Sequence, residues 1–164
     1  MIPRFRFCLL TVLSTLACSL LLFAESPAAE NAFQVQFAES VHQRPFTGRV
    51  YLIFTRSERE PRLGPSWFQP ESFLSQDVKN WQPGEMLEFT PDSKGLLSFP
   101  IPLSEMKLAG YHAQPVVRFN DNDPEIGTAP GNGYSQVITI PAGADQNMPP
   151  LVIDKLVSEK PAVD

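Results

Sequence analysis

The chain has 164 residues, 43% of them hydrophobic and 19% charged, with a formal net charge of −5 at neutral pH. This length favours one domain with a core large enough to fold by itself. The hydrophobic fraction excludes wholesale disorder. The negative charge leaves no chain-wide basic field, so we expect no nucleic-acid partner.

Residues 1–24 have the three-part pattern of a secretory signal peptide. Two arginines stand near the start, residues 8–23 form an apolar run, and small residues follow from Ala24. The run is shorter than the roughly 18–20 apolar residues of a membrane-spanning helix. We therefore expect cleavage after Ala24, or as late as residue 29. The expected location is secreted or periplasmic, with the membrane contacted only in transit through the signal peptide.

Both cysteines of the chain, Cys8 and Cys18, lie inside this segment. Cys18 resembles a lipid-attachment cysteine only in part, because Thr15 stands where such motifs carry an aliphatic residue and the apolar run continues past Cys18. We therefore expect no lipoprotein. Cleavage after Ala24 shortens the chain from 164 to 140 residues and removes two arginines, so the net charge moves from −5 to −7. Without cysteine, the exported domain has no disulfide or thiolate chemistry and depends on its hydrophobic core.

A flexible leader at residues 25–32 precedes a domain at 33–157, and a polar tail follows at 158–164. Alternating or β-branched runs predict seven strands, at residues 33–37, 48–55, 86–90, 96–99, 111–119, 134–140 and 151–156. Pro115 predicts that its strand lies at a sheet edge or contains a bulge. The one helix expected is short, at 104–109 between Ser104 and Gly110. This pattern predicts an all-β fold, an antiparallel immunoglobulin-like β-sandwich of about seven strands.

No catalytic motif is complete in this sequence. Ser135 follows Gly133 as in a nucleophile elbow, but Val137 stands where the elbow needs its second glycine. His42 and His112 are the only histidines and neither lies in a recognisable motif. We therefore expect a protein without enzymatic activity and without a cofactor.

The acidic loop that begins at Asn120 suggests two alternatives. Asp121, Asp123 and Glu125 supply hard oxygens at alternating positions, as calcium loops do. The EF-hand spacing fails, however, because Glu125 and Gly131 occupy the positions of its glycine and glutamate. Asparagine and aspartate are also ordinary turn residues. A solvated turn is the favoured interpretation, and a Ca²⁺ site is the alternative.

Aromatic residues gather in a stretch that we expect to be irregular. Trp67, Phe68, Phe73 and Trp81 lie there among several prolines. Such residues form either a ligand-binding surface or a small additional core that covers one end of the domain. Trp67, Phe68 and Trp81 are the candidate ligand-binding residues, although burial is the favoured interpretation.

Several ordered strings resemble the N-terminal β-sandwich of secreted esterases of the α/β-hydrolase type from planctomycete-like bacteria. They are TGRVYLIF (47–54), EPRLGPSWF (60–68), DVK (77–79), WQPGE (81–85), GTAPGNGYS (127–135) and LVIDKLV (151–157). In that family the catalytic serine, acid and histidine belong to the domain that follows, so no catalytic residue carries over. The resemblance implies an immunoglobulin-like accessory module.

The expected function is an exported, non-catalytic accessory or binding module of unknown ligand. A hydrolase domain or a cell-envelope component is the expected partner. An esterase-associated domain, or the remnant of a secreted hydrolase, is the first alternative. A Ca²⁺-binding extracytoplasmic module is the second.

Overall fold

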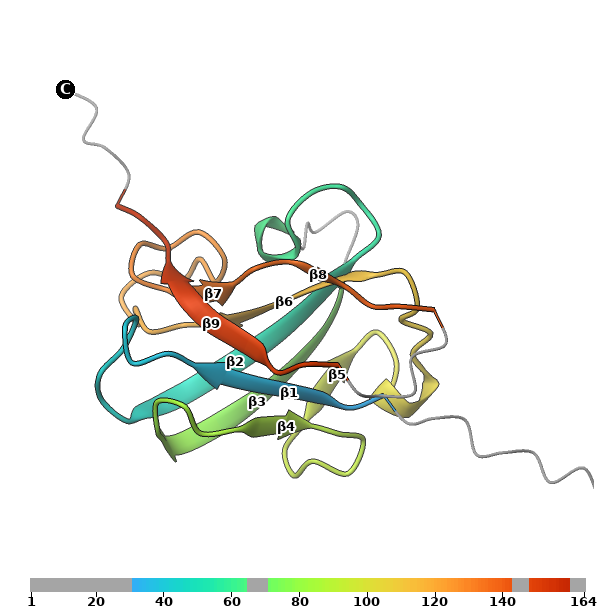
Figure 1. Cartoon of the computed structure of the whole chain (residues 1–164), viewed down its shortest axis with the longest axis horizontal. Coiled ribbons are helices and arrows are strands. Elements are labelled where there is room, and N and C mark those ends of the chain that lie inside the picture. The colour runs from blue at the N-terminus through green and yellow to red at the C-terminus, as the bar shows by residue number, and fades with distance from the viewer. Residues whose placement is uncertain (1–30, 65–70, 143–147, 160–164) are drawn as a thin grey trace, which may run out of the picture.

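The computed structural model describes residues 31–64, 71–142 and 148–159. The expected signal peptide, most of the leader, Trp67, Phe68 and the end of the tail lie outside these residues. The elements are β1 (Phe33–Phe37), β2 (Phe46–Thr55), η1 (Pro61–Leu63), β3 (Ser72–Trp81), β4 (Leu87–Phe89), β5 (Leu97–Phe99), η2 (Leu103–Glu105), β6 (His112–Val117), β7 (Gly133–Ser135), β8 (Ile138–Thr139) and β9 (Leu151–Leu156), where η marks a 3₁₀ turn (Figure 1).

The prediction of an all-β fold is confirmed, but the strand arrangement differs from the predicted sandwich. The strands form one curled sheet, a half-barrel, in the order β4-β1-β9-β7-β6-β2-β3-β5, with β8 paired to β6. The sheet is mixed, because β1 pairs in parallel with β9 and antiparallel with β4. The described residues hold nine strands instead of about seven. Alternation along one strand shows which face is buried and says nothing about the direction of its neighbours.

The sheet curls so that its two halves face each other across the core. Phe33 in β1 and Phe54 in β2 are not on paired strands, yet their ring centroids lie 5.3 Å apart. Phe37 in β1 contacts Trp81 at the end of β3 in the same way, at 4.6 Å. The buried side chains of this core are Phe33, Val35, Phe37, Phe46, Val50, Leu52, Phe54, Leu74, Trp81, Phe89, Leu103, Met106, Leu108, Ala113, Val117, Ile140, Leu151 and Ile153.

β3 is the strand that the sequence analysis missed, within the stretch expected to be irregular. The positions of β3 that face the core are not all apolar, because Gln76 follows Leu74 on that face. The strand therefore lacks a clear alternation of apolar and polar residues. Pairing with β2 stabilises it instead, from Ile53 opposite Phe73 to Arg49 opposite Asp77. Arg49 Nε lies 2.7 Å from Asp77 Oδ1 in an exposed ion pair. The stretch therefore forms a strand because its neighbour supplies the hydrogen bonds and a cross-strand partner.

The predicted helix at 104–109 is wrong. Only the turn η2 forms, and the chain then runs on with Leu103, Met106 and Leu108 buried. The Asn31 side chain donates to the carbonyls of Leu103 and Met106. A segment this short gains too few helical hydrogen bonds to repay nucleation, so side-chain burial decides its path.

Pro115 lies inside the sheet, and the register of β6 with β2 continues through it without a bulge, so neither the predicted edge position nor the predicted bulge is found. β6 pairs with β2 on one side, where Leu52 is opposite Pro115. On its other side, β6 pairs with β7 at Val116 and with β8 at Ala113. The predicted strand at 134–140 is therefore split into β7 and β8, and the break lies beside Pro115, which has no N–H to donate.

The packing of the two halves of the sheet predicts that replacing Phe37 destabilises the fold much more than replacing Phe99. Phe37 is fully buried, so Phe37→Ala leaves a cavity and should lower the free energy of unfolding by about 3–5 kcal/mol. Phe99, which is 38% exposed and stacks on Phe73, should lose only about 1 kcal/mol in Phe99→Ala. Urea unfolding followed by circular dichroism measures both. Equal losses would contradict the assignment of Phe37 to the core.

Candidate functional site

Ser135, the candidate nucleophile of the hydrolase alternative, is buried in β7. It is 2% exposed, and its hydroxyl donates to the carbonyl of Gln136. Among the described residues neither histidine hydrogen-bonds to it: His112 Nδ1 lies 3.0 Å from Thr139 Oγ1, and His42 stacks on Phe119. Ser135 therefore has neither a nearby base nor access for a substrate in this arrangement.

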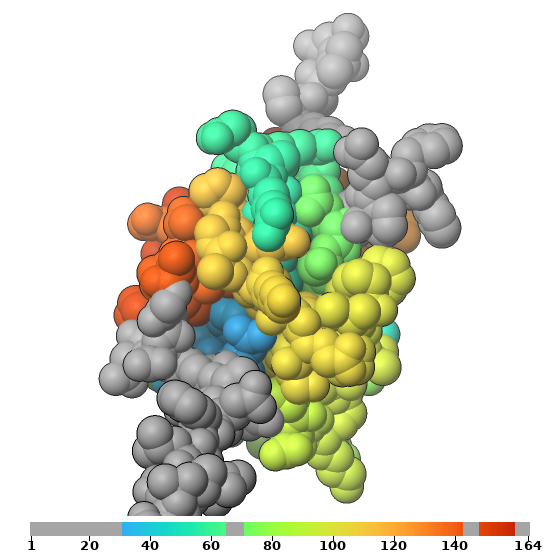
Figure 2. Space-filling view, turned by 90° about the vertical axis from the view of Figure 1, so that its right-hand side faces the viewer, coloured from blue at the N-terminus to red at the C-terminus, as the bar shows by residue number. Residues whose placement is uncertain are grey.

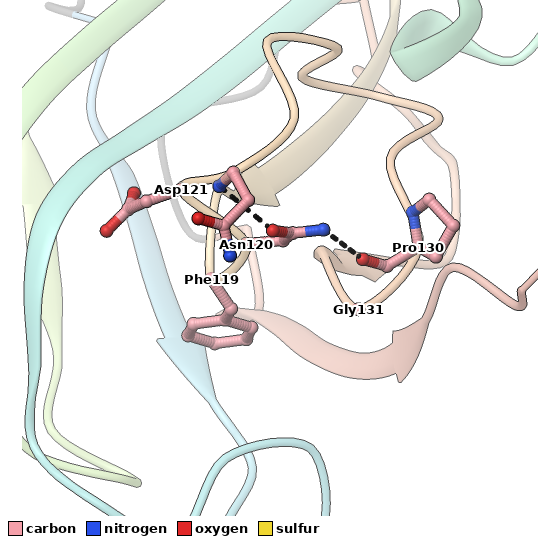
Figure 3. Close-up of a pocket in the computed structure, with 6 residues that line it drawn as sticks. Phe119, Asn120, Asp121, Pro130 and Gly131 are labelled. Atoms are coloured by element: carbon pink, nitrogen blue, oxygen red, sulfur yellow. Dashed lines mark hydrogen bonds between the residues drawn. The ribbon is translucent and has the colours of Figure 1, made fainter.

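The loop between β6 and β7 is organised by one buried asparagine. Asn132, fully buried, accepts a hydrogen bond from the Asn120 amide and donates to the carbonyls of Glu125 and Ile126. Asn120 in turn donates to the carbonyl of Pro130 at 2.9 Å (Figure 3). Arg118 donates to the carbonyls of Asp121 and Asp123. The loop is thus held by hydrogen bonds from two asparagine side chains and one arginine side chain.

The three carboxylates predicted as calcium ligands stay apart. Asp121 and Glu125 are exposed, and Asp123 Oδ1 accepts a hydrogen bond from the Glu125 amide. No group of three metal-ligating side chains forms in the part of the chain that the structure describes. Asp123 thus acts as a turn residue that caps its own backbone.

An open depression of about 580 Å³ lies against this loop. It is lined by Phe119, Asn120, Asp121, Asn122, Pro130 and Gly131 (Figure 3). The side-chain oxygen of Asn120 already accepts the Asn122 amide, and its nitrogen donates to Pro130. The Asn120 side chain is therefore used within the loop, and the exposed side chains of Asp121 and Asn122 are the other polar groups of the lining.

His42 sits in an aromatic cage beside this depression. Its ring stacks on Phe119 at a centroid distance of 4.5 Å and meets Phe37 and Phe46 edge-on. Phe119 approaches so closely that a Cβ at Gly133 would lie 2.6 Å from its ring. Burial, and secondarily the positive charge of Arg44, lower the pKa of His42 below its ordinary value of 6.5.

Of the candidate ligand-binding aromatics, only Trp81 lies among the described residues. It is 4% exposed, and its indole N–H donates to the carbonyl of Glu85. Trp81 is thus a core residue and presents no surface to a ligand. Trp67 and Phe68 lie outside the described residues.

Arg62 covers the outer face of the sheet over β6 and β7, a role that sequence reasoning missed. Its backbone N–H donates to Gln114, and its guanidinium lies 4.3 Å from the centre of the Tyr134 ring. The same guanidinium donates to the carbonyl of Gly127, where a Cβ would lie 1.7 Å from the Arg62 carbonyl oxygen. These contacts close the outer face at this end of the sheet.

At the β5 edge the outer face stays exposed. Leu97 and Phe99 alternate along β5, and Ile101 follows two residues later; they are 54%, 38% and 41% exposed. Phe73 in β3 stacks on Phe99 at 5.6 Å. We call Leu97, Phe99 and Ile101 the β5 strip. The segment from β4 to η2, yellow-green to yellow in Figure 2, forms a large part of that side. The alternation at 97, 99 and 101 was the sequence signal for it.

Comparisons with known proteins identify no family for this chain. No protein-family model, curated protein or solved structure matches the chain. The resemblance to esterase-associated domains therefore stays a prediction. Over the described residues no helix is long and apolar enough to cross a membrane.

The central position of Asn132 predicts a large cost for its removal. Asn132→Ala strands the Asn120 amide and two loop carbonyls, so the free energy of unfolding should fall by about 2–4 kcal/mol. Asn122→Ala, an exposed change in the same loop, should cost less than about 0.5 kcal/mol. Urea unfolding measures both, and a small loss for Asn132→Ala would show that the loop does not depend on it.

The lowered pKa of His42 predicts that the folded protein becomes less stable at acidic pH. Well above pH 6.5 both the folded and unfolded chains hold it neutral; below pH 6.5 the unfolded chain takes up a proton that the folded chain resists. Stability should therefore fall as pH decreases through this range. His42→Phe keeps an aromatic ring that can stack on Phe119 but removes the titrating group. The free energy of unfolding of this variant should therefore depend less on pH, which urea unfolding at several pH values measures. Equal flattening in His112→Phe would assign the effect elsewhere.

Proposed function

We propose that the chain is an exported, non-catalytic interaction module that binds a cell-envelope component through the β5 strip. The observation that carries this proposal is the exposure of Leu97 and Phe99 on one face of β5, with a third exposed apolar side chain, Ile101, two residues further along the chain. Water contact with large apolar side chains is unfavourable, and clustered ones on a soluble domain mark contact surfaces. Their exposure contrasts with the covered outer face over β6 and β7.

Recognition at this surface rests on side chains. Among the described residues, β3 is the one strand that pairs with β5, which places β5 at an edge of the sheet. The strand is three residues long, and Pro100 and Pro102 follow it without an N–H to donate. Short strands and prolines blunt an edge against the addition of another strand. The partner is therefore expected to cover apolar side chains and not to extend the sheet.

The residues that an enzyme would use favour a binding role. Ser135 is buried with its hydroxyl held by a backbone carbonyl, and the half-buried His42 stacks on Phe119. Neither is positioned to activate a nucleophile toward solvent. An esterase-associated domain remains the alternative that the resemblance implies, with a hydrolase domain as its partner.

At the level of fold family, an immunoglobulin-like sandwich remains a proposal. The two facing halves of the curled sheet support it, since they enclose a core as two packed sheets do. The parallel pairing of β1 with β9 departs from the antiparallel pattern that we expected.

The binding role is tested with two triple variants of matched chemistry. Leu97→Ser/Phe99→Ser/Ile101→Ser removes the β5 strip. Val137→Ser/Val152→Ser/Leu156→Ser removes three apolar side chains of comparable exposure (38%, 36% and 41%) from β9 and the link between β7 and β8. Co-sedimentation with isolated bacterial envelopes, and with peptidoglycan and polysaccharides prepared from them, measures binding.

The first variant should bind at least tenfold more weakly than the parent, and the second should bind like the parent. Unfolding midpoints close to that of the parent confirm that both fold. Absence of binding to every fraction, or equal loss in both variants, would contradict the proposed function.

A further inference from the structure

The first described residue, Asn31, is hydrogen-bonded to the segment that follows the β5 strip. The Asn31 side chain donates to the carbonyl of Leu103 at 3.2 Å and to that of Met106 at 2.7 Å. Leu103 follows Ile101, the last residue of the strip, by two positions. The chain N-terminal to Asn31 therefore starts from the segment that directly follows the strip in the sequence.

The apolar run of the sequence ends close to this point. Phe23, its last residue, precedes Asn31 by eight positions. Eight residues span at most about 29 Å when fully extended. If residues 8–23 enter a membrane as the expected signal peptide, the domain that carries the strip stays within that reach of the membrane until cleavage. A short tether raises the effective concentration of the strip at the surface.

We propose that the β5 strip docks on a lipid surface, with Leu97, Phe99 and Ile101 entering the interface of the membrane to which the N-terminal run delivers the chain. This inference rests on the proposed function and names the envelope component as lipid. The sequence analysis expected only the signal peptide to contact a membrane, and the inference adds a membrane contact made by the folded domain. Large apolar side chains that enter the boundary between headgroups and acyl chains give reversible attachment.

The charges around the strip indicate how it holds the membrane. From β4 to Lys107 the chain carries two basic residues, Lys94 and Lys107, and three acidic ones, Glu88, Asp92 and Glu105. The stretch has no excess of positive charge, so attraction to anionic lipids contributes little. Docking should therefore depend on the apolar side chains and change little with salt.

Protein-free vesicles of phosphatidylethanolamine and phosphatidylglycerol test the inference. The full chain and the chain from Glu25 are both used, because every described strand lies between Phe33 and Leu156 and is retained in the shorter form. The chain from Glu25 should float with the vesicles, and the strip variant Leu97→Ser/Phe99→Ser/Ile101→Ser should bind at least tenfold more weakly. Val137→Ser/Val152→Ser/Leu156→Ser should bind like the parent. Binding should change less than twofold between 0.05 and 0.5 M NaCl.

A second readout reports insertion directly. Leu97→Trp places an indole in the strip, and its emission should shift to the blue with vesicles and be quenched by brominated acyl chains. The same substitution at Val152 should show neither change.

Three results would overturn the inference: no flotation of the chain from Glu25, equal loss in both triple variants, or no shift for Leu97→Trp. Strip-dependent binding to peptidoglycan or to protein, without vesicle binding, would overturn the lipid partner and leave the proposed function standing. Strip-dependent self-association in sedimentation velocity without lipid would assign the strip to a second copy.

Discussion

Packing of Phe37 against residues from the opposite half of the sheet is the contact on which the architecture depends. One ring touches Trp81 at the end of β3, Phe119 after β6 and His42 in the loop between β1 and β2. Trp81 lies in β3 and Phe119 directly follows β6, and neither strand pairs with β1, so these contacts hold the two halves of the curled sheet against each other. Trp81, which the sequence analysis named as a candidate ligand-binding residue, is buried in this contact between the two halves of the sheet.

The strands with simple alternation could be predicted from sequence. Residues 33–37 and 151–156 form strands with the predicted bounds, because their buried and exposed positions alternate. β3 could not be predicted in this way, since Gln76 occupies an inward position and the pairing partner decides the conformation. The parallel neighbour of β1 was equally hidden, because no local pattern states which distant strand will lie beside it.

The candidate sites also differ in whether local sequence or long-range packing determines them. Short-range chemistry was readable: the Asn and Asp residues at 120–125 do form turns that cap their own backbone. Long-range placement was not, because the burial of Ser135 and the role of Asn132 depend on residues distant in sequence. The β5 strip had a visible alternation, but only the sheet order shows that β5 is an edge strand and that its outer face is uncovered.

The parallel pair β1–β9 has a consequence for the order of events in the life of the chain. β1 is the first strand and β9 the last, and they are neighbours at the centre of one half of the sheet. β1 therefore lacks one of its two partners until Leu151–Leu156 has been synthesised. Such non-local pairing delays completion of the fold. Under the proposed export, this delay would keep the chain unfolded enough to cross a membrane, because the half of the sheet that contains β1 is completed only when β9 arrives.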